Sequence, residues 1–295
     1  MEFIDCKTIL NRNRNQDWFG TEFTVNLYRG CCHRCIYCDS RSSCYQNFNF
    51  DVVKAKKNAI EILDRELSSV QKRGVIDSGA MGDPYNPFEK ELFLTRRFLE
   101  LCVKHGFGVS ITTKSALIER DIDLLCEISR LSPVICEITV TAGSDSLSRL
   151  VEPNVNPSSR RFKAIKALTD QGIFTGVVLM PVLPFIEDSE ENIGSTREQA
   201  HDSGAQFVFP YFGVTLRQNQ RKWFYGQLRK QFPQMHLDRL YSETYGMAYE
   251  CISINKGRLK ELFESTCKKY SLLYRMEDIV QTYTSKYAHN QLSFF

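Results

Sequence analysis

Segments typical of β-strands alternate with segments typical of amphipathic helices about six times between residues 22 and 212. The strand-like segments are short and rich in apolar and β-branched residues, whereas the helical ones carry apolar residues at intervals of three and four. The expected strands are residues 22–27, 75–79, 108–113, 134–141, 173–180 and 206–212, and the expected helices are residues 51–72, 90–105, 120–130, 158–171 and 190–203. Such alternation predicts a parallel sheet covered by right-handed crossover helices.

Two parallel architectures are compatible with that alternation. An open doubly wound sheet that binds a dinucleotide would carry G-x-G-x-x-G after its first strand, and the sequence has no such run there. The number of units instead fits a partial (β/α)6 barrel of the TIM type, so the expected fold class is α/β. In such barrels the functional side chains lie on loops at the carboxyl ends of the strands.

Three cysteines, Cys31, Cys35 and Cys38, follow the first expected strand with the spacing C-x3-C-x2-C. Thiolates are soft, anionic ligands, and three of them on one tight loop can converge on a single metal centre. Zinc would want a fourth ligand, and no later Cys or His pair supplies a matched spacing. A cubane iron–sulfur cluster held by three cysteines leaves one iron open for another ligand.

The same cysteines are compatible with two simpler arrangements. A zinc knuckle could borrow Cys32, His33 or Cys44 as its fourth ligand. Alternatively, the thiols could simply be small buried side chains without a metal.

Length and composition place few limits on function. The chain has 295 residues and a formal net charge of +3, which permits an acidic partner without requiring one. No apolar run approaches the roughly 20 residues that span a bilayer, and the first residues do not resemble an export signal. The eleven cysteines are therefore expected to be reduced thiols or metal ligands of a cytoplasmic protein without a membrane partner.

The cysteine motif resembles that of the radical S-adenosylmethionine (radical SAM) enzymes, which is C-x3-C-x-aromatic-C near the start of a partial barrel. Tyr37 fills the aromatic position. The resemblance implies a [4Fe–4S] cluster held by Cys31, Cys35 and Cys38, with S-adenosyl-L-methionine (SAM) on the open iron. Reductive cleavage of SAM would then give methionine and a 5′-deoxyadenosyl radical. The implied protein partner is an electron donor such as flavodoxin or ferredoxin.

Residues at the ends of the next expected strands are candidates for binding SAM. Gly82 lets the backbone approach a ligand, and Asp83 can accept a hydrogen bond from the SAM ammonium. Lys114 can pair with the SAM carboxylate, while Thr139 and Thr141 can reach the ribose hydroxyls. Each has an ordinary alternative: turn chemistry before a proline for Asp83, solvation for Lys114, and strand packing for the two threonines.

A closer resemblance, to the spore photoproduct lyase-like branch of the radical SAM proteins, covers nearly the whole chain. It is carried by residues 26–38, 82–85, 113–115, 150–153, 212–219 and 249–251. In the lyases, the residues matching Asp83 and Lys114 contact the amino acid part of SAM. The spore lyase itself has a Cys at the position of Ala80, and that thiol returns a hydrogen atom to the repaired thymine radical. Because alanine has no suitable hydrogen, repair by that route is not expected here.

The chain is expected to have four parts. Residues 1–20 form an arm over the barrel, residues 21–215 the barrel, residues 216–288 a helical extension packed on it, and residues 289–295 a tail. Helices are expected at residues 216–232 and 256–270 of the extension.

The tail resembles the peptide by which bacterial DNA proteins bind the sliding clamp. The residues that match are Gln291, Leu292, Ser293, Phe294 and Phe295. A glutamine, an aliphatic residue and a terminal aromatic pair can dock in an apolar pocket of a partner. The alternative is a tail that packs against the protein's own core.

Basic residues bear on a nucleic-acid partner. Arg12, Arg14, Arg29, Arg34 and Arg41 flank the cysteine motif, and Arg217, Arg221, Lys222 and Arg229 are interleaved with Trp223, Phe224 and Tyr225. Arginine beside aromatic residues suits single-strand stacking, but the same pattern is typical of an amphipathic helix with a solvated face.

The expected function is therefore that of a radical SAM enzyme that abstracts hydrogen from a substrate, with DNA as the candidate. The alternative is a non-catalytic, cluster- or zinc-bearing binding protein that is recruited to DNA through its tail.

Overall fold

The main sheet of the computed structural model, which describes residues 1–287, contains six parallel strands. They are β3 (Phe23–Val25), β6 (Val75–Ser78), β7 (Gly108–Thr113), β8 (Val134–Thr139), β9 (Thr175–Leu179) and β10 (Phe207–Pro210). The parallel strands are neighbours in chain order, and β2 (Leu10–Arg12) adds a seventh, antiparallel strand beside β3. The prediction of an α/β partial (β/α)6 barrel is confirmed.

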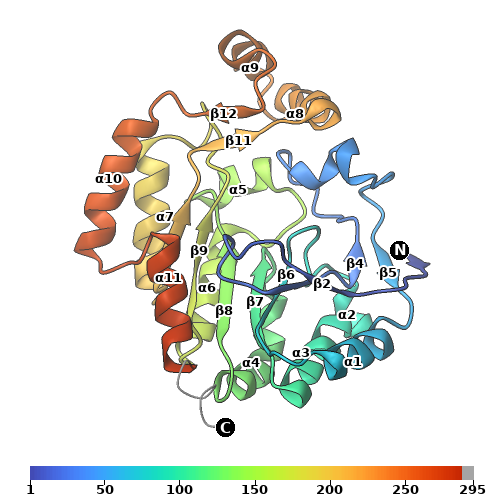
Figure 1. Cartoon of the computed structure of the whole chain (residues 1–295). Coiled ribbons are helices and arrows are strands. Elements are labelled where there is room, and N and C mark those ends of the chain that lie inside the picture. The colour runs from blue at the N-terminus through green and yellow to red at the C-terminus, as the bar shows by residue number, and fades with distance from the viewer. Residues whose placement is uncertain (288–295) are drawn as a thin grey trace.

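Helices cover the outer side of this sheet (Figure 1). They are α1 (Ala59–Ser69), α3 (Leu94–His105), α4 (Ile122–Ser129), α6 (Ser158–Thr169) and α7 (Glu190–Asp202), with the shorter α2 (Glu89–Leu92), η3 (Ala116–Asp121) and α5 (Asp145–Val151) in the connections. Apolar side chains at helical spacing, such as Leu63 and Leu67 of α1, are fully buried in the core. Gly106 ends α3 with a φ of 72°, which suits a glycine at a helix terminus.

Three expected helices have different boundaries. The helix expected at residues 51–72 begins only at Ala59, because residues 54–56 form a strand. The helix expected at 90–105 is divided at Phe93, whose φ is 53°. The helix expected at 120–130 starts as the 3-10 helix η3. In each case the apolar spacing continues through the break, so periodicity alone does not reveal it.

The amino-terminal residues contribute strands to two sheets. A small three-stranded sheet has the order β1 (Glu2–Ile4), β5 (Lys54–Lys56), β4 (Tyr28–Arg29), in which β5 is parallel to β1 and antiparallel to β4. Residues 1–20 were expected to lie as an arm over the barrel. Instead they contribute β1 to the small sheet and β2 to the main sheet.

The carboxyl-terminal part covers one end and one side of the barrel (Figure 1). β11 (Gly213–Thr215) and β12 (Glu250–Ile252) form an antiparallel pair and flank α8 (Gln218–Gln231) and α9 (Leu237–Tyr245). α10 (Lys256–Lys269) packs on α7, and α11 (Met276–Thr284) is held by the Tyr283 hydroxyl, which donates to the Phe19 carbonyl over 2.6 Å. Helices close to the two expected ones are present, whereas β11, β12, α9 and α11 were not predicted. Within residues 1–287 no helix has both the length and the apolar character needed to cross a membrane.

Candidate active site

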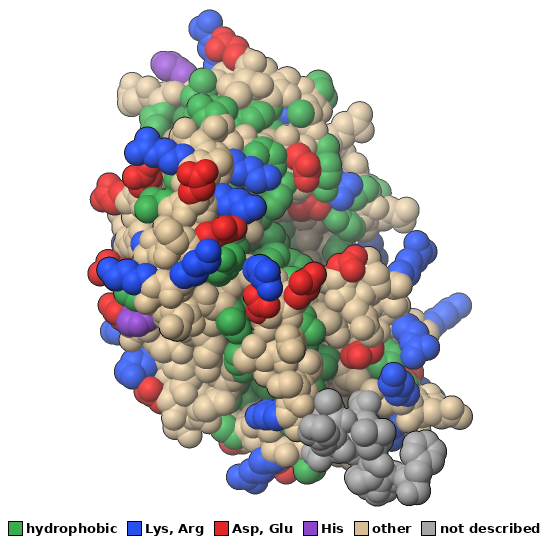
Figure 2. Space-filling view, turned by 60° about the vertical axis from the view of Figure 1, so that its left-hand side comes forward, with side chains coloured by type: hydrophobic (Ala, Val, Ile, Leu, Met, Phe, Trp, Pro, Cys, Tyr) green, Lys and Arg blue, Asp and Glu red, His purple; other side chains and the backbone are tan. Residues whose placement is uncertain are grey.

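A cavity of about 440 Å³ opens at the carboxyl ends of the parallel strands. It is lined by the cysteine loop, which we define as residues 31–38, by residues 79–83 after β6, by the ends of β7, β8 and β9, and by Tyr211, Val214, Thr215 and Glu250. Its volume falls in the range of roughly 300–1,000 Å³ that is usual for small-molecule sites. On the face shown in Figure 2, hydrophobic side chains gather in a recess bordered by acidic and basic ones.

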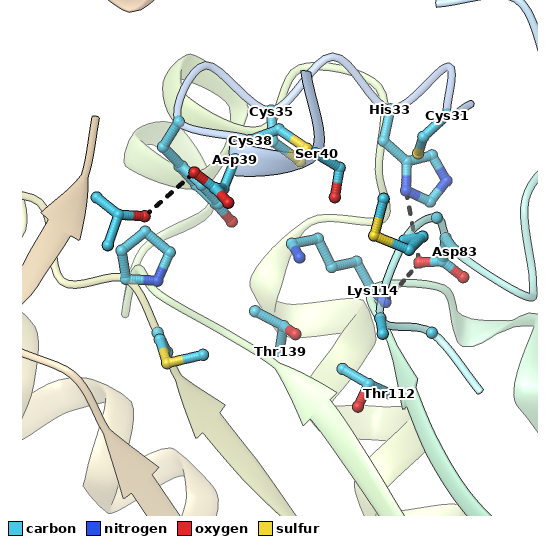
Figure 3. A pocket seen from close by; sticks show the side chains of 18 of the residues that line it. Cys31, His33, Cys35, Cys38, Asp39, Ser40, Asp83, Thr112, Lys114 and Thr139 are labelled. Atoms are coloured by element: carbon cyan, nitrogen blue, oxygen red, sulfur yellow. Dashed lines mark hydrogen bonds and ion pairs between the residues drawn. The ribbon is translucent and has the colours of Figure 1, made fainter. Parts of the chain in front are cut away.

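The cysteine loop brings Cys31, Cys35 and Cys38 to this cavity, as Figure 3 shows. The loop is fixed at both ends by backbone hydrogen bonds: the Cys31 amide donates to the Phe50 carbonyl over 2.8 Å, and the Ile36 amide donates to the Val151 carbonyl over 3.0 Å. Burial raises the pKa of the Cys31 thiol to about 12, and the pKa values of Cys35 and Cys38 are also raised by burial.

A buried polar cluster supports the loop from behind. The Tyr37 hydroxyl donates to one carboxylate oxygen of Glu152, and Arg161 donates to the other. Arg161 also donates to the Thr139 carbonyl over 2.7 Å, which ties the cluster to the end of β8. Burial alone would raise the pKa of the Glu152 carboxyl, but the charges of Arg161 and Lys114 hold it below its usual value. Sequence reasoning missed Glu152 and Arg161 as supporting residues.

Asp83 connects the loop after β6 to its surroundings. Its Oδ1 atom accepts from the Thr113 hydroxyl over 2.6 Å and from the Tyr85 amide over 2.8 Å. Its Oδ2 atom accepts from the Lys114 amide over 2.8 Å and lies 3.5 Å from His33 Nδ1. Since a carboxylate offers about four acceptor positions, most of its capacity is used inside the protein. The turn chemistry considered as the alternative for Asp83 is therefore present, although the residue also lines the cavity.

Lys114 extends its side chain into the space between the strand ends and the cysteine loop (Figure 3). Its Nζ atom lies 5.8 Å from the centroid of the Tyr37 ring. Burial lowers the pKa of this ammonium, but the nearby Cys35, Glu152 and Asp83 raise it by more, so the amine stays protonated. Within residues 1–287 no hydrogen bond or ion pair engages Nζ, so the charge is available to an anionic ligand group.

The other residues predicted to bind SAM are Gly82, Thr139 and Thr141, and not all of them reach the cavity. Gly82 and Thr139 line the cavity, and Thr141 does not. A Cβ atom on Gly82 would lie 2.9 Å from the Gly30 carbonyl oxygen, so this glycine allows close approach to the start of the cysteine loop. Thr141 is fully buried, and its carbonyl accepts from the side-chain Nδ2 atom of Asn192 over 2.9 Å.

Two carboxyl groups lie in the barrel interior beneath the cavity. The Ser110 hydroxyl donates to Glu137 Oε1 over 2.7 Å, and the hydroxyl of Thr112, a cavity residue, donates to Glu137 Oε2. Burial raises the pKa of Glu137 to about 8 and that of Asp77 to about 7. Thr112 is thereby held against the side chain of Glu137, a contact that no sequence pattern indicated.

Comparison with known proteins identifies the superfamily to which this chain belongs. The sequence profile of the radical SAM superfamily matches residues 25–194, which include the cysteine loop and the strands that face it. The chain belongs to the radical SAM superfamily, and it is an enzyme of that class. Enzymes of this superfamily use a [4Fe–4S] cluster and S-adenosylmethionine, and they generally need a reductant.

Several relatives are themselves uncharacterized. An uncharacterized protein of Mycobacterium tuberculosis (strain H37Rv) is 32% identical over 274 residues, covering 90% of this chain and 80% of the relative. An uncharacterized protein of Methanocaldococcus jannaschii is 30% identical over 178 residues, covering 60% and 67%.

Solved structures share the fold at low identity. Spore photoproduct lyase complexed with dinucleoside spore photoproduct has a TM-score of 0.61 and 12% identity, over 91% of this chain and 79% of the lyase. A lyase variant with bound AdoMet and dinucleoside spore photoproduct has a TM-score of 0.57 and 13% identity, over 85% and 74%. At this identity the likeness concerns the fold.

The residues around the cavity fit the cofactors of the superfamily. The donor set is three thiols on one loop, beside a lysine ammonium that has no partner within the described residues. No three His, Cys, Asp or Glu side chains in the described part of the chain are arranged to hold a single metal ion. A cubane does not require such an arrangement, because each cysteine binds a different iron.

Proposed function

We propose that this radical SAM enzyme abstracts hydrogen from a nucleic-acid substrate, with DNA as the first candidate. The observation that carries the proposal is the set of arginine–aromatic contacts around the cavity. The Arg41 guanidinium lies 3.9 Å from the centroid of the Trp223 ring and 5.0 Å from that of Phe50, which lines the cavity. Arg217 lies 4.8 Å from the centroid of Tyr249, beside the cavity residue Glu250. Flat cation–aromatic surfaces of this kind suit stacking of unpaired bases.

Only some of the basic and aromatic residues of α8 can belong to a surface that stacks on bases. Arg221 is buried and donates to the Leu216 and Gly246 carbonyls over 3.2 and 3.0 Å, and Phe224 is in the core. Both are therefore structural residues, and they belong neither to a base-stacking surface nor to a solvated helix face, the two interpretations that the sequence left open. Arg41 pairs with Asp51 over 2.5 Å and contacts the Phe50 and Trp223 rings, so it positions these rings. Trp223 remains as the residue on which a base would stack.

The site residues have separate roles in this proposal. Cys31, Cys35 and Cys38 hold the cluster, and Lys114 pairs with the SAM carboxylate. Asp83 positions the start of η3 through the Lys114 amide and accepts from the SAM ammonium with its remaining capacity.

The rest of the cavity wall binds and shields the ligand. Tyr37 and Gly82 form part of that wall, and Thr139 faces the ribose, whereas Thr141 acts indirectly through the buried interior. When bound, the cluster and SAM supply the radical that abstracts hydrogen, while the chain positions the substrate and excludes water.

The reaction that we propose differs from spore-photoproduct repair. Among the described residues that line the cavity, the only thiols are those of the three proposed cluster cysteines. Ala80 is part of the same wall, and the resemblance to the lyases implies that their hydrogen donor has the position of Ala80. No additional thiol of this wall can return hydrogen to a product radical. We infer that the substrate radical is resolved by another route, and that the substrate is not the spore photoproduct.

The experiment is a deuterium-transfer assay on anaerobically reconstituted protein with dithionite and SAM. Single-stranded oligonucleotides uniformly deuterated on sugar and base are compared with undeuterated ones. Deuterium in the 5′-deoxyadenosine supports the proposal. Cleavage of SAM without deuterium transfer from any oligonucleotide contradicts a nucleic-acid substrate while leaving the enzyme class intact.

We also propose that the barrel at residues 21–215 and the extension at residues 216–288 act as one cytoplasmic unit, with residues 1–20 as its amino-terminal part and residues 289–295 as a targeting tail. The predicted clamp residues Gln291, Leu292, Phe294 and Phe295 lie outside the described residues. Deleting residues 291–295 should abolish retention on immobilised sliding clamp. Unchanged retention of the shortened chain would end the clamp proposal.

A further inference from the structure

One face of the small sheet carries cations side by side. In the register of β4 and β5, Arg29 lies directly opposite Lys54, and Lys56 lies two residues further along the same face. Like charges opposite one another on antiparallel strands destabilise a sheet unless an anion compensates them. Burial and the charge of Arg29 both act to lower the pKa of the Lys56 ammonium.

The acidic residues nearby only partly compensate this charge. Lys54 lies 3.8 Å from Glu2 and Lys57 lies 3.4 Å from Asp5, and both carboxylates are exposed. Within the described part of the chain, neither Arg29 nor Lys56 has an ion pair with a carboxylate. The face therefore presents a local positive charge that is suited to an acidic partner.

The same face forms a groove next to the cysteine loop. The groove has a volume of about 290 Å³, and its lining includes the cationic Arg29 and Lys56, one carboxylate, Asp5, and the uncharged Gly30, Tyr45 and Met81. Met81 also lines the main cavity, and Gly30 is the single residue between Arg29 and Cys31. The groove thus lies on the outer side of the wall whose inner side faces the cluster ligands.

The groove and the cavity do not open through the same residues. Met81 is the one lining residue that they share among those described, and the residues of β11 and β12 at the cavity are absent from the groove. A substrate must enter the cavity to react, whereas an electron needs only a short path through the wall. An anionic electron carrier is therefore a better match for this face than the nucleic acid of the proposed function.

We propose that the outward face of the sheet β1–β5–β4, around Arg29, Lys54 and Lys56, docks an acidic one-electron carrier that reduces the cluster. This inference rests on the radical SAM class and on the cluster position in the proposed function. In the step, a flavin hydroquinone loses one electron and becomes the semiquinone, and the [4Fe–4S] cluster gains that electron, passing from the 2+ to the 1+ state. Electron-transfer contacts are typically small and depend on charge steering.

The test uses the full chain and a purified flavodoxin. Lys54→Glu with Lys56→Glu should weaken binding of oxidised flavodoxin in low-salt calorimetry by about tenfold or more, and Glu2→Gln with Asp5→Asn should strengthen it. The Glu2/Asp5 variant keeps the proposal testable if the Lys54/Lys56 variant misfolds, because a damaged fold would not bind flavodoxin more tightly. The matched control is Lys256→Glu with Lys268→Glu on α10, which makes the same change of net charge on the other side of the molecule and should leave binding within about twofold.

A kinetic measurement separates docking from damage to the cluster. In stopped-flow reduction of reconstituted protein, the Lys54/Lys56 variant should be slowed with flavodoxin hydroquinone but reduced by dithionite at a rate close to that of the parent. Equal slowing by both reductants, or unchanged flavodoxin affinity, would overturn the proposal. Loss of single-stranded DNA binding with unchanged flavodoxin binding would also overturn it and assign the face to nucleic acid.

Discussion

Arg161 and Glu152 form an ion pair in which neither side chain is exposed to solvent, immediately behind the cysteine loop. The same carboxylate accepts from the Tyr37 hydroxyl, so the pair fixes a residue that lies between two predicted cluster ligands. Arg161 also donates to Ser148 over 2.9 Å and to the Thr139 carbonyl. The geometry of the loop therefore depends on a charge network that belongs to α5, α6 and β8.

Replacing Arg161 with Met should lower the free energy of unfolding by about 3–5 kcal/mol, because it leaves the Glu152 carboxylate buried without its cation. Urea denaturation of the apoprotein measures the change. Arg160→Met is the matched control, since the neighbouring Arg160 pairs with the more exposed Glu119 and should cost about 1 kcal/mol or less. Equal losses in the two variants would contradict the importance of the buried pair.

Single replacement of Cys31, Cys35 or Cys38 by Ala should reduce the content of reconstituted protein from about four iron atoms per chain to less than about one. Each thiolate is expected to hold its own iron, so the loss of one opens the cubane. Iron and acid-labile sulfide analyses on anaerobic protein provide the measurement. Cys32→Ala and Cys44→Ala serve as controls and should keep a full cluster; a deficit in the Cys32 variant would point to a different ligand set.

Lys114→Met should weaken SAM binding by about 10- to 100-fold, because a charge-assisted hydrogen bond contributes about 1.5–3 kcal/mol. The change is measured by equilibrium dialysis of reconstituted protein against labelled SAM. Lys90→Met, which removes an exposed lysine of α2, should leave the affinity within about twofold. Unaltered SAM affinity in the Lys114 variant, with the cluster intact, would remove this residue from the site.

The barrel and the cysteine site could be predicted from the sequence because both depend on local patterns. Alternating strands and helices reflect burial that repeats within each segment, and the spacing of the three cysteines lies within one loop. Short strands such as β4 and β12 escape prediction, because two or three residues do not show a period and their pairing is long-range. The ion pair of Arg161 with Glu152 is hidden for a related reason: nine residues separate the partners, and burial decides their role.

The same difference between local sequence patterns and long-range contacts decides which properties of the individual site residues could be predicted. The position of Lys114 after a strand indicated the cavity, but the lack of a partner for its ammonium within the described residues depends on the whole wall. Asp83 precedes Pro84, which predicts a turn, yet its contact with His33 requires the fold to bring the cysteine loop to β6. The expected strand included both Thr139 and Thr141, but β8 ends at Thr139, which lines the cavity, whereas Thr141 lies beyond the strand and is buried away from the cavity.

The barrel interior should make the protein less stable as the pH rises from about 4.5 to about 8. Burial raises the pKa of Glu137 to about 8 from an ordinary value of 4.5 and that of Asp77 to about 7 from 3.8. A raised carboxyl pKa means that the unfolded chain releases its proton first, so the stabilisation is complete below the unfolded pKa and is lost as the pH approaches the folded pKa. Each such group contributes a slope of about −1.4 kcal/mol per pH unit in that window.

Urea denaturation of the apoprotein between pH 5 and pH 8 tests this slope. Glu137→Gln keeps the hydrogen-bonding shape toward Ser110 and Thr112 but cannot ionise, so its stability should fall less steeply with pH by about 1.4 kcal/mol per unit. Glu119→Gln is the matched control, because it makes the same change of side chain at a partly exposed position on η3. If the Glu137 variant and the parent gave parallel stability curves, the folded protein would not hold the Glu137 carboxyl in its protonated form, and the predicted contribution of this group would be contradicted.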